Sequence, residues 1–274
     1  MADLRSRIAL VTGASRGIGR GIAHELGIAG ATVYISGRSV SDDETTEQLG
    51  GNVHGTAALV TESGGTGIAV RCDHTNDSEV EGLFERIQNE QGKLDILVNN
   101  VWGGYERFGD HDFSMPFWKQ PMSRWSLMFD AGVRAHYVAS CLAVPLMIPQ
   151  GSGLIVNISA GDNGKYRGWV MYDAAKEAVD RMAFALAQEL QSHGITALAL
   201  YPGLTRTERV MRYSTPEELA SSESPRYAGR AVVSLATDRD VMRRSGNAYK
   251  TGELAREYGF TDIDGRQPPP FTFG

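Results

Sequence analysis

The sequence has few cysteines and no long hydrophobic run. Only two cysteines, Cys72 and Cys141, occur among 274 residues, so a disulfide framework is excluded and a reducing cytoplasm is the simplest compartment. Both lie in apolar runs, and we expect buried small side chains rather than catalytic thiols. No uninterrupted run of about 18 apolar residues occurs, so no transmembrane helix is expected. The apolar run near the N-terminus is too short for a signal peptide.

Positive charge is also in short supply. The chain has 27 Lys and Arg against 33 Asp and Glu, a net charge of -6 at pH 7. Binding a nucleic-acid backbone requires a surplus of cations on one face, so a general nucleic-acid function is excluded. The six histidines are scattered without the spacing of metal ligands, so no metal site is predicted. The composition is that of a globular enzyme, for which we expect a small-molecule substrate.

Strand-like and helix-like segments alternate along most of the chain. The strand-like segments are short apolar or β-branched runs: Arg7–Thr12, Ala31–Ser36, Gly67–Asp73, Leu94–Asn99, Gly153–Ser159, Ile195–Tyr201 and Asn247–Gly252. The helical segments are Gly17–Leu26, Thr56–Glu62, Asp77–Gln91, Trp125–Met147, Met171–His193 and Ser224–Thr237. Repeated βα units predict an α/β protein with a single-domain Rossmann fold over residues 1–274. Its doubly wound parallel sheet has about seven strands, with helices on both faces.

A glycine-rich turn follows the first strand and opens the first helix. Glycines at such a place permit a tight turn and let backbone N–H groups approach a pyrophosphate at the positive end of a helix. We therefore predict that a dinucleotide binds at this loop. The residues expected to hold it are Gly13, Ser15, Arg16, Gly17, Ile18 and Gly19.

The residue after the second strand indicates which dinucleotide binds. NAD-binding domains place an acid here to bond the ribose 2′-hydroxyl, whereas this chain has Arg38. A guanidinium matches the oxygens of a 2′-phosphate, and Arg16 is a second candidate. The sequence therefore predicts NADP(H), with two solvated surface arginines as the alternative. At the end of the third strand, Asp73 and His74 are expected to edge the adenine ring.

Two residues of the long helix have the spacing of an acid–base pair. Tyr172 and Lys176 are four residues apart and share one face of a helix that starts near the ligand edge of the sheet. A phenol titrates at about pH 10, but a nearby ammonium and a positive nicotinamide stabilise its phenolate. We expect Tyr172 to pass a proton to a carbonyl oxygen while hydride arrives at the carbon.

Together these segments resemble the short-chain dehydrogenase/reductase family, and within it the dehydrogenase/reductase member-one branch. The matches span nearly the whole chain: TGASRGIG (12–19), CDHT (72–75), DILVNN (95–100), GLIVNIS (153–159), YDAAK (172–176), YPGLTRT (201–207) and GELAREYGFTDIDGR (252–266). The resemblance implies that Tyr172 is the catalytic acid/base, and that Lys176 holds the nicotinamide ribose and lowers the pKa of Tyr172. It also implies a homodimer or homotetramer, and cofactor contacts from Asn100, Pro202, Gly203, Thr205 and Thr207.

The position of the catalytic serine is ambiguous by one residue. Counting back from Tyr172 by the family's commonest spacing gives Ser159, whereas aligning the strand GLIVNIS gives Ala160. We favour Ser159 as the catalytic serine, because a hydroxyl is needed to hold the substrate oxygen.

Two further positions depart from the family pattern. Trp102 puts a large ring where glycine is common, beside the expected nicotinamide site, and narrows the pocket. The family often carries an asparagine in the helix Trp125–Met147 where this chain has Gly132. Gly132 leaves room for a water molecule, or Asp130 substitutes for the asparagine.

An insert near residues 102–124 is rich in aromatic side chains, and a proline-rich tail occupies residues 264–274. Aromatic rings suit an apolar pocket wall, so we expect Trp102, Tyr105, Phe117 and Trp118 to line the substrate pocket, with packing against the core as the alternative. The predicted function is an NADPH-dependent oxidoreductase that interconverts a carbonyl and an alcohol on a mostly apolar small molecule. The alternative is a family member that binds NADP(H) without redox chemistry, as a sensor, scaffold, lyase or isomerase.

Overall fold

The computed structural model describes residues 3–43, 45, 48–106 and 115–273, so residues 107–114 of the predicted insert lie outside the described part of the chain. Within the described residues, seven strands form one parallel sheet in the order β3-β2-β1-β4-β5-β6-β7. The strands are β1 (Ile8–Val11), β2 (Thr32–Gly37), β3 (Thr66–Arg71), β4 (Ile96–Asn99), β5 (Gly153–Ile158), β6 (Ile195–Tyr201) and β7 (Ala248–Lys250). The predicted doubly wound sheet is confirmed, since the strand order reverses between β1 and β4.

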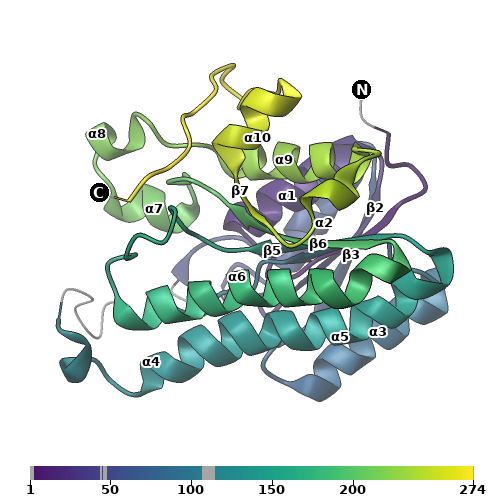
Figure 1. Ribbon diagram of the computed structural model, residues 1–274, viewed down its shortest axis with the longest axis horizontal. Coiled ribbons are helices and arrows are strands. Elements are labelled where there is room, and N and C mark those ends of the chain that lie inside the picture. Colours follow the sequence, from purple (N-terminus) through teal and green to yellow (C-terminus); the bar gives the residue numbers. More distant parts are fainter. Residues whose placement is uncertain (1–2, 44, 46–47, 107–114, 274) are drawn as a thin grey trace.

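Two layers of helices cover the sheet (Figure 1). One face carries α1 (Gly17–Ile28), α2 (Val53–Glu62), α9 (Pro225–Thr237) and α10 (Thr251–Tyr258). The other face carries α3 (Asp77–Gln91), α5 (Ala135–Met147) and α6 (Val170–Leu190). The shorter elements are α4 (Ser123–Trp125), a π-helical stretch (Ser126–Arg134), α7 (Glu208–Tyr213), α8 (Pro216–Leu219) and the 3-10 turns Phe117–Lys119, Ile148–Gln150, Gln191–His193 and Val241–Arg244.

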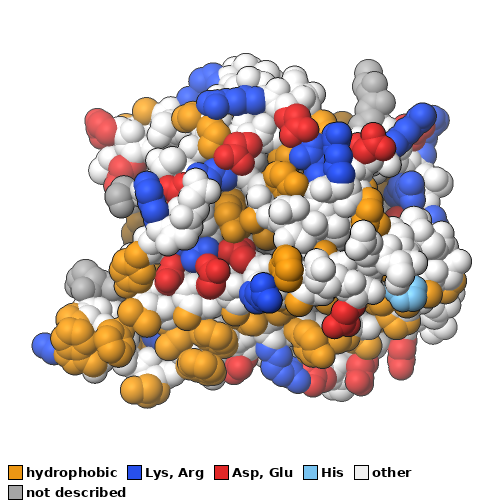
Figure 2. All heavy atoms as spheres, viewed as in Figure 1, with side chains coloured by type: hydrophobic (Ala, Val, Ile, Leu, Met, Phe, Trp, Pro, Cys, Tyr) orange, Lys and Arg blue, Asp and Glu red, His pale blue; other side chains and the backbone are white. Residues whose placement is uncertain are grey.

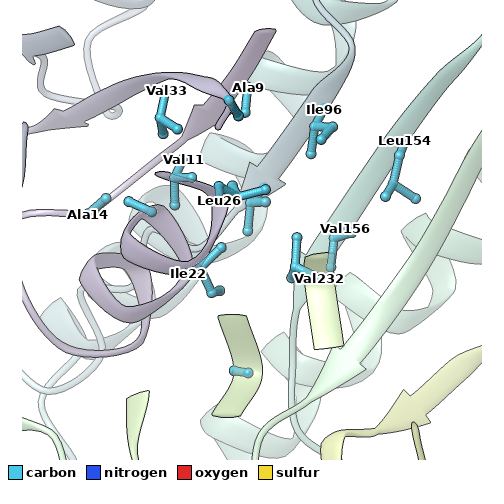
Figure 3. Close-up of a cluster of buried hydrophobic side chains, with 14 of the residues drawn as sticks. Ala9, Val11, Ala14, Ile22, Leu26, Val33, Ile96, Leu154, Val156 and Val232 are labelled. Atoms are coloured by element: carbon cyan, nitrogen blue, oxygen red, sulfur yellow. The ribbon is translucent and has the colours of Figure 1, made fainter. Parts of the chain in front are cut away.

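Buried aliphatic side chains pack between the central strands and the helix layer that contains α1 and α9. In Figure 3, Val11 of β1, Val33 of β2 and Ile96 of β4 lie in one cluster with Ile22 and Leu26 of α1. All five side chains are almost completely shielded from water. This packing fixes the carboxyl ends of the central strands, where ligands bind in sheets of this topology.

Helix capping explains two differences from the predicted elements. α2 begins before the predicted Thr56, because the Asn52 side chain accepts a hydrogen bond from the Gly55 N–H and caps the helix. α8 was not predicted, although Thr215 and Glu218 form a capping box there. The signal for this short helix was therefore present in the sequence.

The C-terminal strand and one cysteine also differ from the prediction. The expected strand Asn247–Gly252 ends at Lys250, where α10 takes over the chain. Cys72 is buried, as predicted, and burial raises its pKa to about 12. The prediction that Cys141 is buried is wrong, because it lies on the outward face of α5.

One covering helix is unusually long and apolar. The continuous helical segment Ser123–Gln150 has the length and composition of a membrane span. It also packs on α3, β4 and β5, and it contributes Ala139, Ala143 and Met147 to the second buried cluster. A helix that covers a sheet has the same composition, so this segment is weak support for a membrane contact.

The crossing of α1 and α9 depends on a glycine. A Cβ atom at Gly21 would lie 2.3 Å from the Pro225 carbonyl oxygen. We expect Gly21→Ala to lower the free energy of unfolding by about 1–3 kcal/mol, because the two helix backbones must move apart. Urea unfolding followed by circular dichroism measures this change.

Gly82 in α3 provides the matched control, because a Cβ there would meet nothing within 4 Å. Gly82→Ala should raise the free energy of unfolding by up to about 1 kcal/mol through helix propensity alone. Equal effects of the two substitutions would contradict the close helix crossing.

Candidate active site

A cleft of about 260 Å³ lies at the carboxyl ends of β1 to β4. Many of the predicted cofactor residues line it: Gly13, Ser15, Arg16, Gly17, Ile18, Arg38, Asp73, His74, Asn100 and Thr207. Six of the predicted cofactor residues, all of them described, do not line this cleft: Gly19, Tyr172, Lys176, Pro202, Gly203 and Thr205. The structure therefore gathers most of the predicted dinucleotide site into one place.

The glycine-rich loop has the geometry of an anion site. Gly13 and Gly17 have φ angles of 63° and 56°, in the left-handed region that favours glycine. The Gly17 N–H donates a 2.9 Å hydrogen bond to a carboxylate oxygen of Glu208, which follows the Thr207 cap of α7. This loop amide therefore already holds an anion, at the N-terminus of α1.

Asn100 and Gly19 pack against the glycine-rich loop and fix its position. The Asn100 side-chain amide donates 3.0 Å hydrogen bonds to the carbonyl oxygens of Thr12 and Gly13. A Cβ at Gly19 would lie 2.5 Å from that amide nitrogen. Gly19 thus permits the close packing of α1, the loop and β4 rather than lining the cleft.

Two arginines line the cleft near the end of β2, where the sequence predicts the adenosine part of the cofactor. Arg16 donates hydrogen bonds to the Ser39 hydroxyl at 2.8 Å and to the Gly50 carbonyl at 3.2 Å. Arg38 forms an ion pair with Glu106, and its side chain remains 41% exposed. Both guanidinium groups are therefore within one site, and Arg38 already holds a carboxylate there.

The predicted adenine edge consists of one charged and one neutral residue. Burial lowers the pKa of His74 to about 4, so the ring is neutral, and its Nε2 shares a 2.8 Å hydrogen bond with the Ser36 hydroxyl. Burial alone would raise the pKa of Asp73, but hydrogen bonds from the N–H and hydroxyl of Thr75 hold it below its usual value. Asp73 therefore remains a carboxylate.

Tyr172 and Lys176 lie side by side in a buried cluster. They are one helical turn apart on α6, with exposures of 8% and 6%. The Lys176 ammonium donates a 3.4 Å hydrogen bond to the Ile158 carbonyl. It lies 4.1 Å from the centre of the Trp102 ring and 5.8 Å from the centre of the Tyr172 ring.

The electrostatics of this pair differ from the prediction that Lys176 lowers the pKa of Tyr172. Burial raises the pKa of Tyr172 well above its usual value, and contact with Tyr105 raises it further. Burial also lowers the pKa of Lys176 to about 8. Loss of hydration therefore has the largest effect on both groups, and in the protein alone Tyr172 is a neutral phenol at pH 7.

The geometry does not support Ser159 as the catalytic serine. The Ser159 hydroxyl is buried and donates a 3.2 Å hydrogen bond to the Lys176 carbonyl. Ala160 instead packs in the cluster that contains Tyr172. Neighbouring residues on an extended chain point in opposite directions, so only one of the two can face the phenol. The alignment along the strand agrees with this arrangement, and a catalytic role for Ser159 stays a prediction.

Trp102 explains the glycine at position 132. A Cβ at Gly132 would lie 2.7 Å from the Trp102 ring, so the ring fills the space beside the π-helical stretch. The expectation that Gly132 leaves room for a water molecule is therefore wrong. The charge of Asp130 raises the pKa of Arg134, and its substitution for the family asparagine stays a prediction.

A second cavity, of about 750 Å³, lies next to the Tyr172 cluster. Its wall is mainly apolar and includes Met128 and Met171, which also pack against Tyr172. Of the four predicted substrate-pocket residues, Phe117 and Trp118 line this cavity. Trp102 and Tyr105 line the first cleft instead, so the tyrosine cluster separates two compartments.

Comparison with known proteins decides the family. The family model described as short chain dehydrogenase matches residues 7–218. This chain belongs to the short-chain dehydrogenase family.

Similar proteins extend the family match over nearly all of this short-chain dehydrogenase. Dehydrogenase/reductase SDR family member 1 of Mus musculus is 40% identical over 97% of this chain and 86% of its own length. A 3beta-hydroxysteroid dehydrogenase of Mediterraneibacter gnavus is 35% identical over 78% of this chain and 71% of its own. A solved 7alpha-hydroxysteroid dehydrogenase complexed with NADH and 7-oxo glycochenodeoxycholic acid has a TM-score of 0.76 at 25% identity, covering 97% of this chain and 96% of its own.

As a short-chain dehydrogenase, the chain is an oxidoreductase that binds a nicotinamide dinucleotide and acts on a small molecule; members of the family are commonly oligomeric. The residues present fit such a cofactor, since the Gly17 N–H holds a carboxylate oxygen at the start of α1. The glycine loop would hold the pyrophosphate, and Lys176 the nicotinamide ribose.

Arg167 is a structural residue beside the candidate active site that the sequence analysis missed. Its guanidinium is buried and contacts the carboxylates of Asp173, Glu177 and Asp180 at 2.9, 3.2 and 2.9 Å. It also donates a hydrogen bond to the Ala160 carbonyl. The three acids are spaced along one face of α6, which was the available signal, but the sequence does not show which cation meets them.

Asp180 connects this ion cluster to the active site. Burial raises its pKa to about 6, while the hydroxyls of Ser159 and Tyr201 and the charge of Arg167 act in the opposite direction. Arg167 and Asp180 therefore hold the segment after β5 against α6, which sets the position of Tyr172.

The lowered pKa of Lys176 predicts a pH dependence. We expect kcat/KM of the oxidoreductase to fall as the pH rises through about 8, because the buried ammonium then loses its proton. An exposed lysine would keep its charge to about pH 10. The measurement is consumption of the reduced cofactor across this range, with cofactor affinity and far-UV circular dichroism as controls. A profile that stays level to about pH 10 would contradict this assignment.

Proposed function

We propose that this chain is an NADPH-dependent reductase that interconverts a carbonyl and an alcohol on a mostly apolar small molecule. The observation that carries the proposal is the place of the Tyr172 phenol between two compartments. Trp102 and Tyr105 connect its cluster to the first cleft, which several charged residues line, and Met128 connects it to the second cavity. A proton donor at such a boundary can meet a cofactor on one side and a substrate on the other.

The preference for NADPH is supported by the charges at the end of β2. Arg38 follows β2 where an NAD-binding domain would carry an acid, and Arg16 lines the same part of the cleft. A 2′-phosphate is a dianion whose oxygens match two guanidinium groups. The carboxylate of Glu106, paired with Arg38, is the anion that this phosphate would replace.

The chemistry follows from the protonation states of the two central residues. When bound, a reduced nicotinamide supplies hydride to the carbonyl carbon. Tyr172 then gives its proton to the carbonyl oxygen, since its phenol is protonated at pH 7. The Lys176 ammonium stabilises the phenolate that remains, and water restores the proton.

The walls of the second cavity support a bulky apolar substrate. Phe117 and Trp118 are 60% and 68% exposed, and apolar side chains gather over α4 and the preceding turn in Figure 2. A cavity of about 750 Å³ has the size of a small-molecule site. The relatives named as hydroxysteroid dehydrogenases make polycyclic ketones suitable first probes.

One observation favours the second candidate, a family member that binds NADP(H) without redox chemistry. The Ser159 hydroxyl points toward the Lys176 carbonyl. The residue that packs in the Tyr172 cluster is Ala160, whose side chain has no polar group. Saturable NADPH binding without turnover on any ketone or aldehyde would support this candidate.

Tyr172→Phe tests the reductase proposal. We expect it to lower kcat by about 10²–10⁴-fold, because the proton donor is lost. NADPH affinity, measured by fluorescence titration, should change little. The matched control is Tyr137→Phe, since Tyr137 is an exposed phenol on α5. Unchanged turnover in Tyr172→Phe on polycyclic and aromatic ketones would remove Tyr172 from the mechanism.

Arg38→Gln tests the cofactor preference. We expect kcat/KM for NADPH to fall by about 10- to 100-fold, the value of one charge-assisted contact, while that for NADH does not fall. Arg86→Gln is the control, because Arg86 pairs with Glu90 on the surface of α3. An unaltered NADPH/NADH ratio in Arg38→Gln would refute the phosphate contact.

A further inference from the structure

Reduction of a carbonyl requires more than one polar contact at its oxygen. As hydride adds to the carbon, the π electron pair moves to the oxygen, which becomes strongly basic. An oxygen in this state accepts at least two hydrogen bonds, and donors held ready for it contribute much of the rate enhancement. Tyr172 supplies one donor, and the active site needs a second.

The segment after β5 does not provide the second donor. The Ser159 hydroxyl donates a hydrogen bond to the Lys176 carbonyl. It also lies close enough to the Asp180 carboxylate to lower its pKa. Ala160, which packs in the Tyr172 cluster, has no hydroxyl. The donor must therefore come from another element of the fold.

Tyr105, from the segment after β4, has a hydroxyl at the required place. It shares a hydrogen bond with the Tyr172 hydroxyl. The two rings stack with their centroids 6.4 Å apart and their planes inclined by 25°. Tyr105 also lines the first cleft, the side from which a cofactor would approach.

Burial raises the pKa of Tyr105, so its phenol stays protonated and is able to donate a hydrogen bond. The Arg209 guanidinium lies 5.3 Å from the centre of its ring. A nearby cation makes a phenol a stronger donor, because it stabilises the negative charge that the oxygen gains. The Trp102 ring lies edge-on to both phenols, with centroids 6.0 and 5.5 Å away, and this packing restricts their motion.

We propose that Tyr105 is a catalytic residue that holds the substrate's carbonyl oxygen, in place of a serine hydroxyl. This inference rests on the proposed reductase function. The carbonyl oxygen would lie between the two phenols and receive a hydrogen bond from each. It takes the electron pair released by hydride addition and the proton of Tyr172, and the Tyr172 phenolate regains a proton from water. Tyr105 keeps its own proton throughout.

The test combines a loss with a rescue. Tyr105→Phe should lower kcat for NADPH-dependent reduction of a polycyclic ketone by about 100-fold, while NADPH affinity and thermal stability stay near wild type. Adding Ala160→Ser to Tyr105→Phe places a hydroxyl on the side that faces Tyr172, and should restore kcat to within about 10-fold of wild type. A merely structural role for Tyr105 would not be rescued by a serine at position 160.

Tyr213→Phe is the matched control, because Tyr213 is an exposed phenol that also lies near Arg209. It should retain wild-type kcat. Trp102 carries the other buried donor of the cluster, a ring N–H for which the described residues offer no acceptor. Loss of activity in Trp102→Phe or Ser159→Ala, with none in Tyr105→Phe, would overturn the proposal.

Failure of this inference can be distinguished from failure of the proposed function. If the wild-type protein binds NADPH but reduces no ketone or aldehyde, the reductase function is wrong and Tyr105 has no catalytic role. If the wild type turns over and Tyr105→Phe is equally active, only the role of Tyr105 is overturned. A Tyr105→Phe loss that Ala160→Ser does not rescue overturns the stated equivalence to serine.

Discussion

The Lys176 ammonium lies 4.1 Å from the centre of the Trp102 ring and is almost completely shielded from water. Burying a cation costs free energy, which an indole ring and the Ile158 carbonyl offset only in part, so the pKa of Lys176 falls to about 8. The arrangement requires glycine at position 132, because any side chain there would meet the ring. The place of the Trp102 ring and the glycine at position 132 therefore depend on each other, although the two residues lie 30 positions apart in the sequence.

A second buried charge holds this arrangement in place. Arg167 joins the Ala160 carbonyl to the acids on one face of α6, and Asp180 joins the same cluster to the neighbourhood of Ser159. Removing one partner of such a buried ion cluster leaves an uncompensated charge, so the members hold one another in position. The consequence for chemistry is that Tyr172 has little freedom to move, while Tyr105 belongs to the segment after β4 and is independent of this cluster.

Local sequence signals predicted the fold and the cofactor cleft because they act over short distances. The apolar strands and the glycine loop are read within a few residues, and Arg38 follows directly from the end of β2. The central cluster was harder, because it depends on contacts between distant segments. Ser159 and Ala160 differ by one position, which is enough to turn a side chain to the opposite side of an extended chain. Nothing local indicates that Tyr105 meets Tyr172.

Two of the carboxylates that line the cleft connect cofactor binding to the tyrosine pair. Glu208 accepts a hydrogen bond from the Gly17 N–H, and Glu106 pairs with Arg38. Both carboxylates contact hydrogen-bond donors that a phosphate would use, the Gly17 N–H and the Arg38 guanidinium. A phosphate carries more negative charge than a carboxylate. Glu106 directly follows Tyr105 in the chain, so an anion that displaces Glu106 from Arg38 also changes the restraints on Tyr105. Arg38, the proposed phosphate contact, and Tyr105, the proposed second hydrogen-bond donor, are thus joined by one ion pair and a single peptide bond.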